Sequence, residues 1–233
     1  METRINKFLS EAGVCSRRAA DRLIEEKRVT IDGALAQTGS RVFEGAVVCV
    51  DGKAIAKEQE SVVIVFNKPV GVVCTAQKKE KNNVIDFIGY PKRIFPVGRL
   101  DKDSEGLLLL TNDGELMNRV LKASELHEKE YIVTVDKEVT HEFLRRMENG
   151  VPVLDKITAP CVVRKINRFS FCIILTQGLN RQIRRMCEYF GYHVVKLKRV
   201  RIMNIRLGEL KAGTYRELTK DERTELYKTA GIL

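Results

Sequence analysis

The stretch that decides the fold of the larger part of the chain spans residues 95–114 and reads FPVGRLDKDSEGLLLLTNDG. Its four consecutive leucines, Leu107–Leu110, predict a buried strand, because a short continuous apolar run bounded by turn residues is typical of one. Gly98 and Gly106 bound a polar loop that leads into this strand. The loop carries three acids, which are Asp101, Asp103 and Glu105.

The acidic loop is open to three interpretations from its residues alone. Alternating carboxylates suit calcium or magnesium, but the distal bidentate glutamate and the fixed glycine of a calcium-binding hand are missing. A plain acidic turn without a ligand is the second interpretation. The third is a catalytic carboxylate. The loop residues alone do not distinguish these interpretations, so the surrounding sequence has to be considered.

Strands and helices are mixed on both sides of the loop without strict alternation. Strands are predicted over 62–66, 131–135 and 169–176. Helices are predicted over 115–122, 140–147 and 180–190, the last with Asn180 as its N-cap. Thr219 and Glu222 have the spacing of a capping box for a final helix. This mixture predicts an α+β domain around a mixed, mostly antiparallel sheet.

The first part of the chain reads as a smaller unit of two helices and a small sheet. Ser16 is a suitable N-cap for the second helix. Two Asp-Gly pairs, at 32–33 and 51–52, each follow a β-branched run and predict tight turns. We therefore divide the chain into a unit at 1–55, a linker at 56–62 and a larger domain at 63–233.

Charge is distributed unevenly along the chain. Residues 1–60 carry ten Lys/Arg and ten Asp/Glu, whereas residues 161–206 carry eleven Lys/Arg and a single acid, Glu188. The surplus of that second stretch equals the net charge of the whole chain, +10. A concentrated basic surface is the usual footprint of a nucleic-acid partner, although a solvated basic face without a ligand would give the same count.

Several other classes of protein are disfavoured. No two of the six cysteines form a Cys-x-x-Cys pair, and the three histidines lie far apart, which argues against a zinc site and favours free thiols. No apolar run approaches the roughly 18 residues that span a bilayer. The N-terminus lacks the apolar stretch of a secretion signal. We expect a cytoplasmic protein without membrane contact.

The first unit resembles an S4-type RNA-binding domain over residues 4–33. The matching segments are RINKFL at 4–9, GVCSRRAA at 13–20, LI at 23–24 and VTIDG at 29–33. The resemblance implies binding to structured ribosomal RNA, such as a stem–loop. Arginine side chains on the early turns of the second helix can pair with phosphate oxygens.

The larger domain resembles the RsuA-type pseudouridine synthases, which pair an S4 domain with an rRNA-modifying domain. Besides GRLD at 98–101 and TNDG at 111–114, the matches are NKPVG at 67–71, EKEY at 128–131 and GLNRQIRRM at 178–186. The resemblance implies isomerisation of uridine to pseudouridine in ribosomal RNA, with large-subunit RNA as the expected substrate. It implies no cofactor and no metal, and we expect a monomer.

The resemblance also assigns roles to individual residues. Asp101 is the expected catalytic carboxylate, with Arg184 as its cation. Tyr131 is expected to lie against the target base, Ile183 to pack beneath the same pocket, and Arg99 to enter the gap left by a flipped base. The residues expected to bind RNA are Arg4, Lys7, Arg17, Arg18, Arg22, Arg181, Arg185, Arg199 and Arg201.

Two other classes of function stay open at this point. A non-catalytic RNA-binding or ribosome-assembly factor could share the fold, but it would be free to lose Asp101, Arg184 or Tyr131, and all three are present. A magnesium-dependent phosphoryl-transfer enzyme would use the acidic loop, but the sequence has no Gly-x-x-x-x-Gly-Lys-Ser/Thr stretch. Whether Asp101 attacks C1′ of the ribose or removes the 2′ proton is also undecided.

Overall fold

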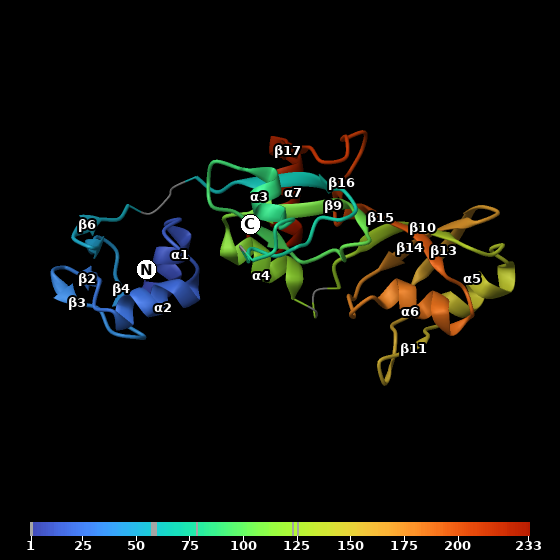
Figure 1. Cartoon of the computed structure of the whole chain (residues 1–233), viewed down its shortest axis with the longest axis horizontal. Helices are drawn as coiled ribbons and strands as arrows, with labels where there is room; N and C mark the ends of the chain where they lie inside the picture. Colours follow the sequence, from blue (N-terminus) through green and yellow to red (C-terminus); the bar gives the residue numbers. More distant parts are fainter. Residues whose placement is uncertain (1, 57–59, 78, 123, 125) are drawn as a thin grey trace. The chain divides into compact units, whose positions relative to one another are not determined.

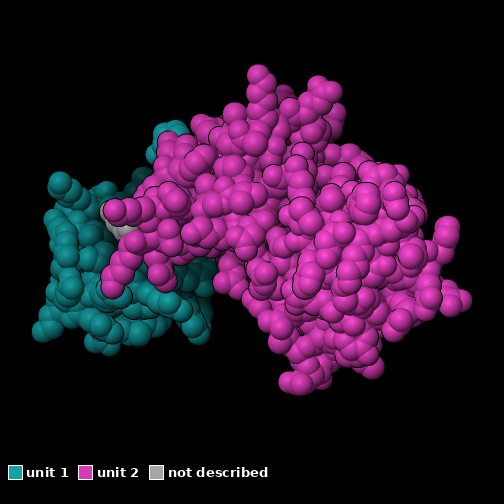
Figure 2. All heavy atoms as spheres, turned by 45° about the vertical axis from the view of Figure 1, so that its right-hand side comes forward, with its two compact units in different colours: residues 1–62, 91–93, 112–114 teal, residues 63–90, 94–111, 115–233 magenta. Residues whose placement is uncertain are grey.

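The computed structural model describes residues 2–56, 60–77, 79–122, 124 and 126–233. The chain forms two compact units (Figure 2). The first comprises residues 1–62 together with the short segments 91–93 and 112–114, and the second comprises the remainder. Of the expected linker at 56–62, residues 57–59 lie outside the described part of the chain.

The first unit packs two short helices against small antiparallel sheets (Figure 1). Ser16 caps α2 as predicted, since its hydroxyl accepts a hydrogen bond from the Ala19 amide at 3.2 Å. Ile5 and Leu9 of α1 meet Ala20 and Ile24 of α2 in the core. The elements are β1 Thr3–Arg4, α1 Ile5–Glu11, α2 Arg17–Glu25, β2 Val29–Ile31, β3 Ala34–Leu35, β4 Arg41–Val42, β5 Val48–Val50 and β6 Lys53–Ala54.

The second unit is built on a nine-stranded sheet in the order β13-β14-β10-β15-β9-β7-β17, with β16 paired to β15 and β8 paired to β9. Its strands are β7 Val63–Lys68, β8 Phe95–Val97, β9 Glu105–Thr111, β10 Lys129–Val135, β13 Val162–Asn167, β14 Ser170–Leu175, β15 Val194–Ile202, β16 Ile205–Arg206 and β17 Tyr215–Glu217. A separate hairpin is formed by β11 Pro152–Val153 and β12 Lys156–Ile157. Its helices are α3 Val84–Ile88, α4 Gly114–Leu121, α5 His141–Glu148, α6 Gln182–Tyr189 and α7 Lys220–Thr229.

Two antiparallel half-sheets meet at the pairing of β9 with β15. This pairing is parallel and short, with Glu105 opposite Lys198 and Gly106 opposite Arg199. Gly106 has a φ of +104°, and a Cβ atom there would lie 2.2 Å from the Arg199 carbonyl oxygen. Because that obstacle is backbone, only glycine fits. The end of the acidic loop is therefore also the point at which the half-sheets join.

Each half-sheet is covered by its own helices. Helices α5 and α6 pack on the β13-β14-β10-β15 half, where Phe143 and Met186 contribute to one apolar core (Figure 1). Helices α4 and α7 pack on the β9-β7 half, where Leu116 and Leu226 contribute to a second core. Thus the expectation of an α+β domain with a mixed, mostly antiparallel sheet is confirmed.

The structure has three of the four predicted helix N-caps. Thr140 caps α5, and Thr219 forms the predicted capping box with Glu222 at α7. The prediction for α6 was wrong, because its N-cap is Arg181 rather than Asn180. Among the described residues, none of the helices is both long and apolar enough to cross a membrane.

Candidate active site

The loop that carries Asp101 is held by hydrogen bonds involving residues on both sides of Asp101. The Leu100 amide donates to Cys74 Sγ at 3.4 Å, and the Gly71 amide donates to the Lys102 carbonyl at 2.8 Å. Within the loop, the Ser104 amide donates to the Asp101 carbonyl at 3.1 Å. These contacts join the loop to the segment that follows β7, so Asp101 sits on a braced turn rather than a free one.

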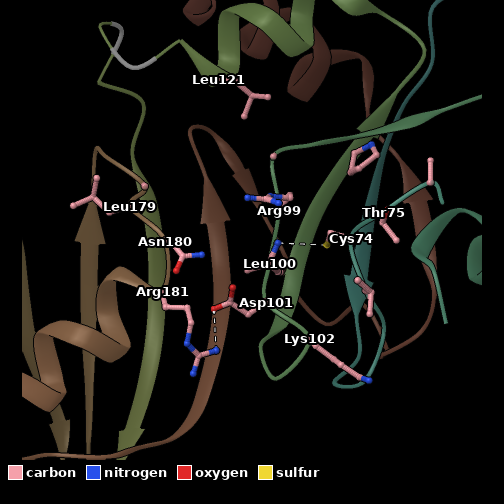
Figure 3. A pocket seen from close by; sticks show the side chains of 15 residues that line it. Cys74, Thr75, Arg99, Leu100, Asp101, Lys102, Leu121, Leu179, Asn180 and Arg181 are labelled. Atoms are coloured by element: carbon pink, nitrogen blue, oxygen red, sulfur yellow. Dashed lines mark hydrogen bonds and ion pairs between the residues drawn. The ribbon is translucent and has the colours of Figure 1, made fainter. Parts of the chain in front are cut away.

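Asp101 lines a cavity of about 770 Å³ in the second unit (Figure 3). Three segments far apart in sequence form its wall, together with Pro96 and Leu121. They are residues 73–76 after β7, residues 98–102 of the acidic loop and residues 178–181 before α6. A cavity of this size is in the range of small-molecule sites and can accept a nucleotide base with its ribose.

The cation beside Asp101 is Arg181. Figure 3 shows the two side chains pointing toward each other, and Arg181 Nη1 lies 3.8 Å from Asp101 Oδ2. The same nitrogen lies 3.8 Å from Asp103 Oδ2. The expectation that Arg184 would supply this cation is corrected by the geometry, because Arg184 is directed elsewhere.

Arg184 is buried, with 8% of its surface exposed, and its guanidinium donates hydrogen bonds to backbone carbonyls. Its Nη2 donates to the Asp103 carbonyl at 3.0 Å and its Nη1 to the Val194 carbonyl at 3.1 Å. The sequence placed Arg184 at the edge of the apolar face of α6, whereas the fold encloses it with Ile183 and Met186. The Arg184 side chain thus supports the acidic loop by a hydrogen bond to the loop's main chain and not to one of its carboxylates.

Arg199 was expected to face RNA phosphates, and the structure contradicts this. Only 3% of its surface is exposed, and its Nε donates to the Leu107 carbonyl at 2.7 Å. Its guanidinium lies 6.0 Å from the centre of the Tyr131 ring. Arg199 lies on the strand that meets β9 at the sheet junction, so its side chain is enclosed where the half-sheets join.

Arg201 was also expected to bind phosphate and is instead neutralised within the protein. Its side chain is 12% exposed, and its guanidinium donates to Glu130 at 2.7 Å and Glu128 at 2.9 Å. The hydrogen bond from Arg201 lowers the pKa of Glu130 below its ordinary value, against the effect of burial. A guanidinium with two carboxylate partners has little charge left to offer RNA.

Among the remaining predicted residues, Arg99 belongs to the cavity lining, and Tyr131 and Ile183 do not. Arg99 lines the cavity and is exposed. Tyr131 is partly buried, packed against the core beneath α6, and Ile183 is 4% exposed in that same core. Arg185 is half-buried, and its Nε donates to the Asn180 carbonyl at 3.1 Å. Of the cations predicted to bind RNA in the first unit, Arg4, Arg17, Arg18 and Arg22 are exposed, whereas half-buried Lys7 pairs with Glu11 at 3.5 Å.

Sequence reasoning missed the buried ammonium of Lys68. Its Nζ is enclosed and donates to the carbonyls of Pro69 at 2.9 Å and Val72 at 2.7 Å. Burial lowers the pKa of Lys68, and the nearby carboxylates of the acidic loop oppose that effect. The available signal was a lysine that ends an apolar strand run just before a Pro-x-Gly turn.

Sequence reasoning also missed the cavity wall at residues 73–76, and no local pattern marks it. Cys74 and Thr75 line the cavity. Among the described residues, no group of three or more His, Cys, Asp or Glu side chains could hold a metal ion. The acidic loop instead directs two of its carboxylates at Arg181.

Comparison with known proteins agrees with this geometry. Residues 62–189 match the family model described as RNA pseudouridylate synthase, and residues 3–48 match that of the S4 domain. A similar relative from Salmonella typhi, named dual-specificity RNA pseudouridine synthase RluF, is 54% identical over 228 residues, covering 97% of this chain and 79% of the relative. The relative of the same name from Escherichia coli K12 is 52% identical over 227 residues, covering 97% and 78%.

A more distant relative and a solved structure extend the likeness. The ribosomal large subunit pseudouridine synthase B of Bacillus subtilis is 37% identical over 228 residues, covering 94% of this chain and 93% of the relative. A crystal structure of a pseudouridylate synthase superposes with a TM-score of 0.69 at 27% identity, covering 97% of this chain and 99% of that one. The braced aspartate, its cavity and these likenesses agree, and the chain belongs to the RNA pseudouridylate synthase family, with an S4 domain at its N-terminus.

Proposed function

We propose that the chain converts uridine to pseudouridine in ribosomal RNA of the large subunit and that Asp101 is its catalytic carboxylate. The observation that carries the assignment is the position of Asp101, which lines the 770 Å³ cavity on a braced loop with a guanidinium 3.8 Å away. The choice of large-subunit RNA is supported by the Bacillus subtilis relative, which is named a ribosomal large subunit pseudouridine synthase.

The main chemical requirement of the reaction is a carboxylate held near C1′ of the ribose. The N1–C1′ bond breaks, the base turns, C5 bonds to C1′, and the proton on C5 is lost while N1 gains one, so no atoms are added or removed overall. Breaking the glycosidic bond builds positive charge on the ribose. A carboxylate at C1′ can stabilise that charge or form a covalent adduct, and taking up the 2′ proton is its other route.

Four other predicted residues have supporting roles in this proposal. Tyr131 lies against the base, with Arg199 over its ring, and base–aromatic stacking contributes about 1–3 kcal/mol. Ile183 supports Tyr131 from the core beneath α6. Arg184 fixes the loop at the Asp103 carbonyl and acts on the substrate only through that loop. Arg99, exposed at the cavity, enters the space left when the target nucleotide leaves its stack.

RNA outside the cavity is held by cations in both units. The exposed residues Arg4, Arg17, Arg18 and Arg22 of the first unit, with Lys7 beside them, are suited to the phosphates of a stem–loop. Arg185 offers a further cation at α6 of the second unit. We propose that the chain acts in the cytoplasm, where its ribosomal RNA substrate would be, and that it acts as a monomer.

Pseudouridine mapping tests this assignment. Ribosomal RNA is mapped from cells that lack the gene and carry it back as wild type, Asp101→Asn or Asp103→Asn. We expect at least one large-subunit site to be lost with Asp101→Asn and kept with Asp103→Asn, which removes a charge from the same loop. Normal modification at every site with Asp101→Asn would refute the catalytic assignment.

A further inference from the structure

Arg181 has a backbone conformation that aims its side chain at the acidic loop. It occupies the N-cap of α6 with φ 51° and ψ 34°, in the left-handed region, and its side chain makes no capping hydrogen bond. A non-glycine residue there costs about 1–2 kcal/mol relative to the right-handed form. The strain is compatible with function, since sparsely populated conformations cluster at active sites and ligand clamps.

The contact that Arg181 makes is shared and weak. One nitrogen lies 3.8 Å from a carboxylate oxygen of Asp101 and 3.8 Å from one of Asp103. These distances are too long for charge-assisted hydrogen bonds, which are about 2.7–2.9 Å. The three side chains are 39%, 33% and 67% exposed, so solvent screens the attraction. Such a contact can be given up for a better partner at little cost.

The neighbouring arginines of α6 differ in this respect. Arg184 is buried and donates to two carbonyls, so it cannot leave without stranding them. Arg185 donates to the Asn180 carbonyl and has no acid within ion-pair distance among the described residues. Arg181 therefore combines three properties that its neighbours lack: a place in the cavity wall, a carboxylate contact and freedom to move.

We propose that Arg181 exchanges partners when RNA binds: it neutralises Asp101 and Asp103 in the free enzyme and then pairs with a phosphate of the bound RNA. A phosphate offers a guanidinium two parallel hydrogen bonds, which the 3.8 Å contacts do not. The exchange uncovers the Asp101 carboxylate only where RNA is present. This inference rests on the proposed role of Asp101, but it concerns binding and is testable without turnover.

Exchange and permanent pairing predict different couplings. If Arg181 leaves the acids when RNA binds, removing the acids frees it beforehand, so their removal tightens RNA binding more when Arg181 is present. If Arg181 stays on the acids in the complex, the ion pair is the same before and after binding, so their removal changes binding by the same factor with and without Arg181, or by less with it where bound RNA strengthens the pair. Only the exchange predicts a larger effect of the acids when Arg181 is present.

The test is a double-mutant cycle on RNA affinity. One arm is Arg181→Asn, which removes the positive charge and keeps a residue type that tolerates positive φ. The other is Asp101→Asn with Asp103→Asn, which removes both carboxylates. The probe is the stem–loop of large-subunit ribosomal RNA that wild type binds most tightly among transcribed fragments, with cytidine at every uridine of its loop so that turnover is prevented. Thermal unfolding verifies that all four proteins are folded.

We expect removal of the acids to tighten binding about two- to fivefold more with Arg181 than without it, which corresponds to the strength of an exposed ion pair. Arg181→Asn alone should make the log–log salt slope shallower by about 0.7–0.9, the value for one phosphate contact. A coupling ratio of one, or coupling of the opposite sign, would overturn the exchange. Arg185→Gln is the matched control and should show no coupling to the acids.

A catalytic failure would remain distinguishable from a failure of this inference. If Asp101→Asn leaves modification intact while the expected coupling is found, Arg181 exchanges partners but the carboxylate it releases is not catalytic. If Asp101→Asn abolishes modification and the coupling is absent, the catalytic assignment holds and the exchange does not.

Discussion

The arginines that begin α2 in the first unit and three arginines of the basic segment at 161–206 have the same chemistry but different surroundings. Arg17 and Arg18 begin α2 and are exposed. In the basic segment, Arg184 and Arg199 are buried and donate to backbone carbonyls, and Arg201 is held by two glutamates. Residues 1–60 have no net charge and yet present exposed guanidinium groups, whereas these three arginines of the basic segment use theirs within the protein.

This difference shows that the net charge counted from the sequence is not the charge that a region exposes to RNA. A guanidinium offers RNA a long-range attraction only if it faces solvent, and it stabilises the fold only if its hydrogen bonds are satisfied within the protein. Substitutions in the two groups should therefore have opposite consequences. Substitutions that affect the three enclosed arginines should alter stability, and those on α2 should alter RNA binding.

The largest effect on stability is expected from Arg199→Ala. It leaves a cavity and strands the Leu107 carbonyl at the junction of the half-sheets, so the free energy of unfolding in urea should fall by about 2–4 kcal/mol. The salt slope of RNA binding should not change. A shallower salt slope of RNA binding with unchanged stability would show instead that Arg199 contacts phosphate, and it would contradict the internal role assigned to this arginine.

A smaller effect is expected from Glu130→Gln. Loss of the charged partner of Arg201 should lower the free energy of unfolding by about 1–2 kcal/mol at pH 7. Because the folded pKa of Glu130 lies below its ordinary value of 4.5, its stabilisation is complete above that value and is lost as pH falls through the folded pKa. The difference between wild type and variant should therefore shrink in urea titrations below pH 4.5.

Glu128→Gln is the control for that experiment, since this second partner of Arg201 is 53% exposed. An exposed pair contributes about 0–1 kcal/mol, so its loss should have the smaller effect at pH 7. Equal effects of the two substitutions, or a Glu130→Gln effect that grows in acid, would contradict the burial difference on which the prediction rests.

The smallest effect on stability is expected from Arg17→Ala combined with Arg18→Ala. Both side chains are exposed, so the free energy of unfolding should change by less than about 0.5 kcal/mol. If each contacts one phosphate, the log–log salt slope should become shallower by about 1.4–1.8 in total. An unchanged slope would show that these residues do not contact RNA.

Local features of the chain were predictable because they depend on near neighbours. The caps at Ser16 and Thr140 and the capping box at Thr219 each involve residues three positions apart. The four leucines of β9 were recognisable as a buried strand for the same reason. The exception among the caps, Arg181, requires a left-handed conformation that its residue type gave no reason to expect.

The surroundings of the arginines depend on contacts between distant residues, and no local pattern contains them. The hydrogen bond from Arg199 joins residues 92 positions apart, and that from Arg184 to Asp103 joins residues 81 apart. Periodicity placed Arg184 near the apolar face of α6 but could not show which carbonyls would meet it. Asp101 itself was identified from its motif, while its contact with Arg181 became visible only in three dimensions.

The central claim is that Asp101 performs the chemistry while other residues hold the RNA. The most direct test combines purified Asp101→Asn with a transcribed ribosomal RNA fragment that wild type modifies, and measures RNA affinity and pseudouridine formed in the same preparation. The account predicts affinity within a fewfold of wild type and no detectable pseudouridine. Pseudouridine formed at the wild-type rate by Asp101→Asn would contradict it.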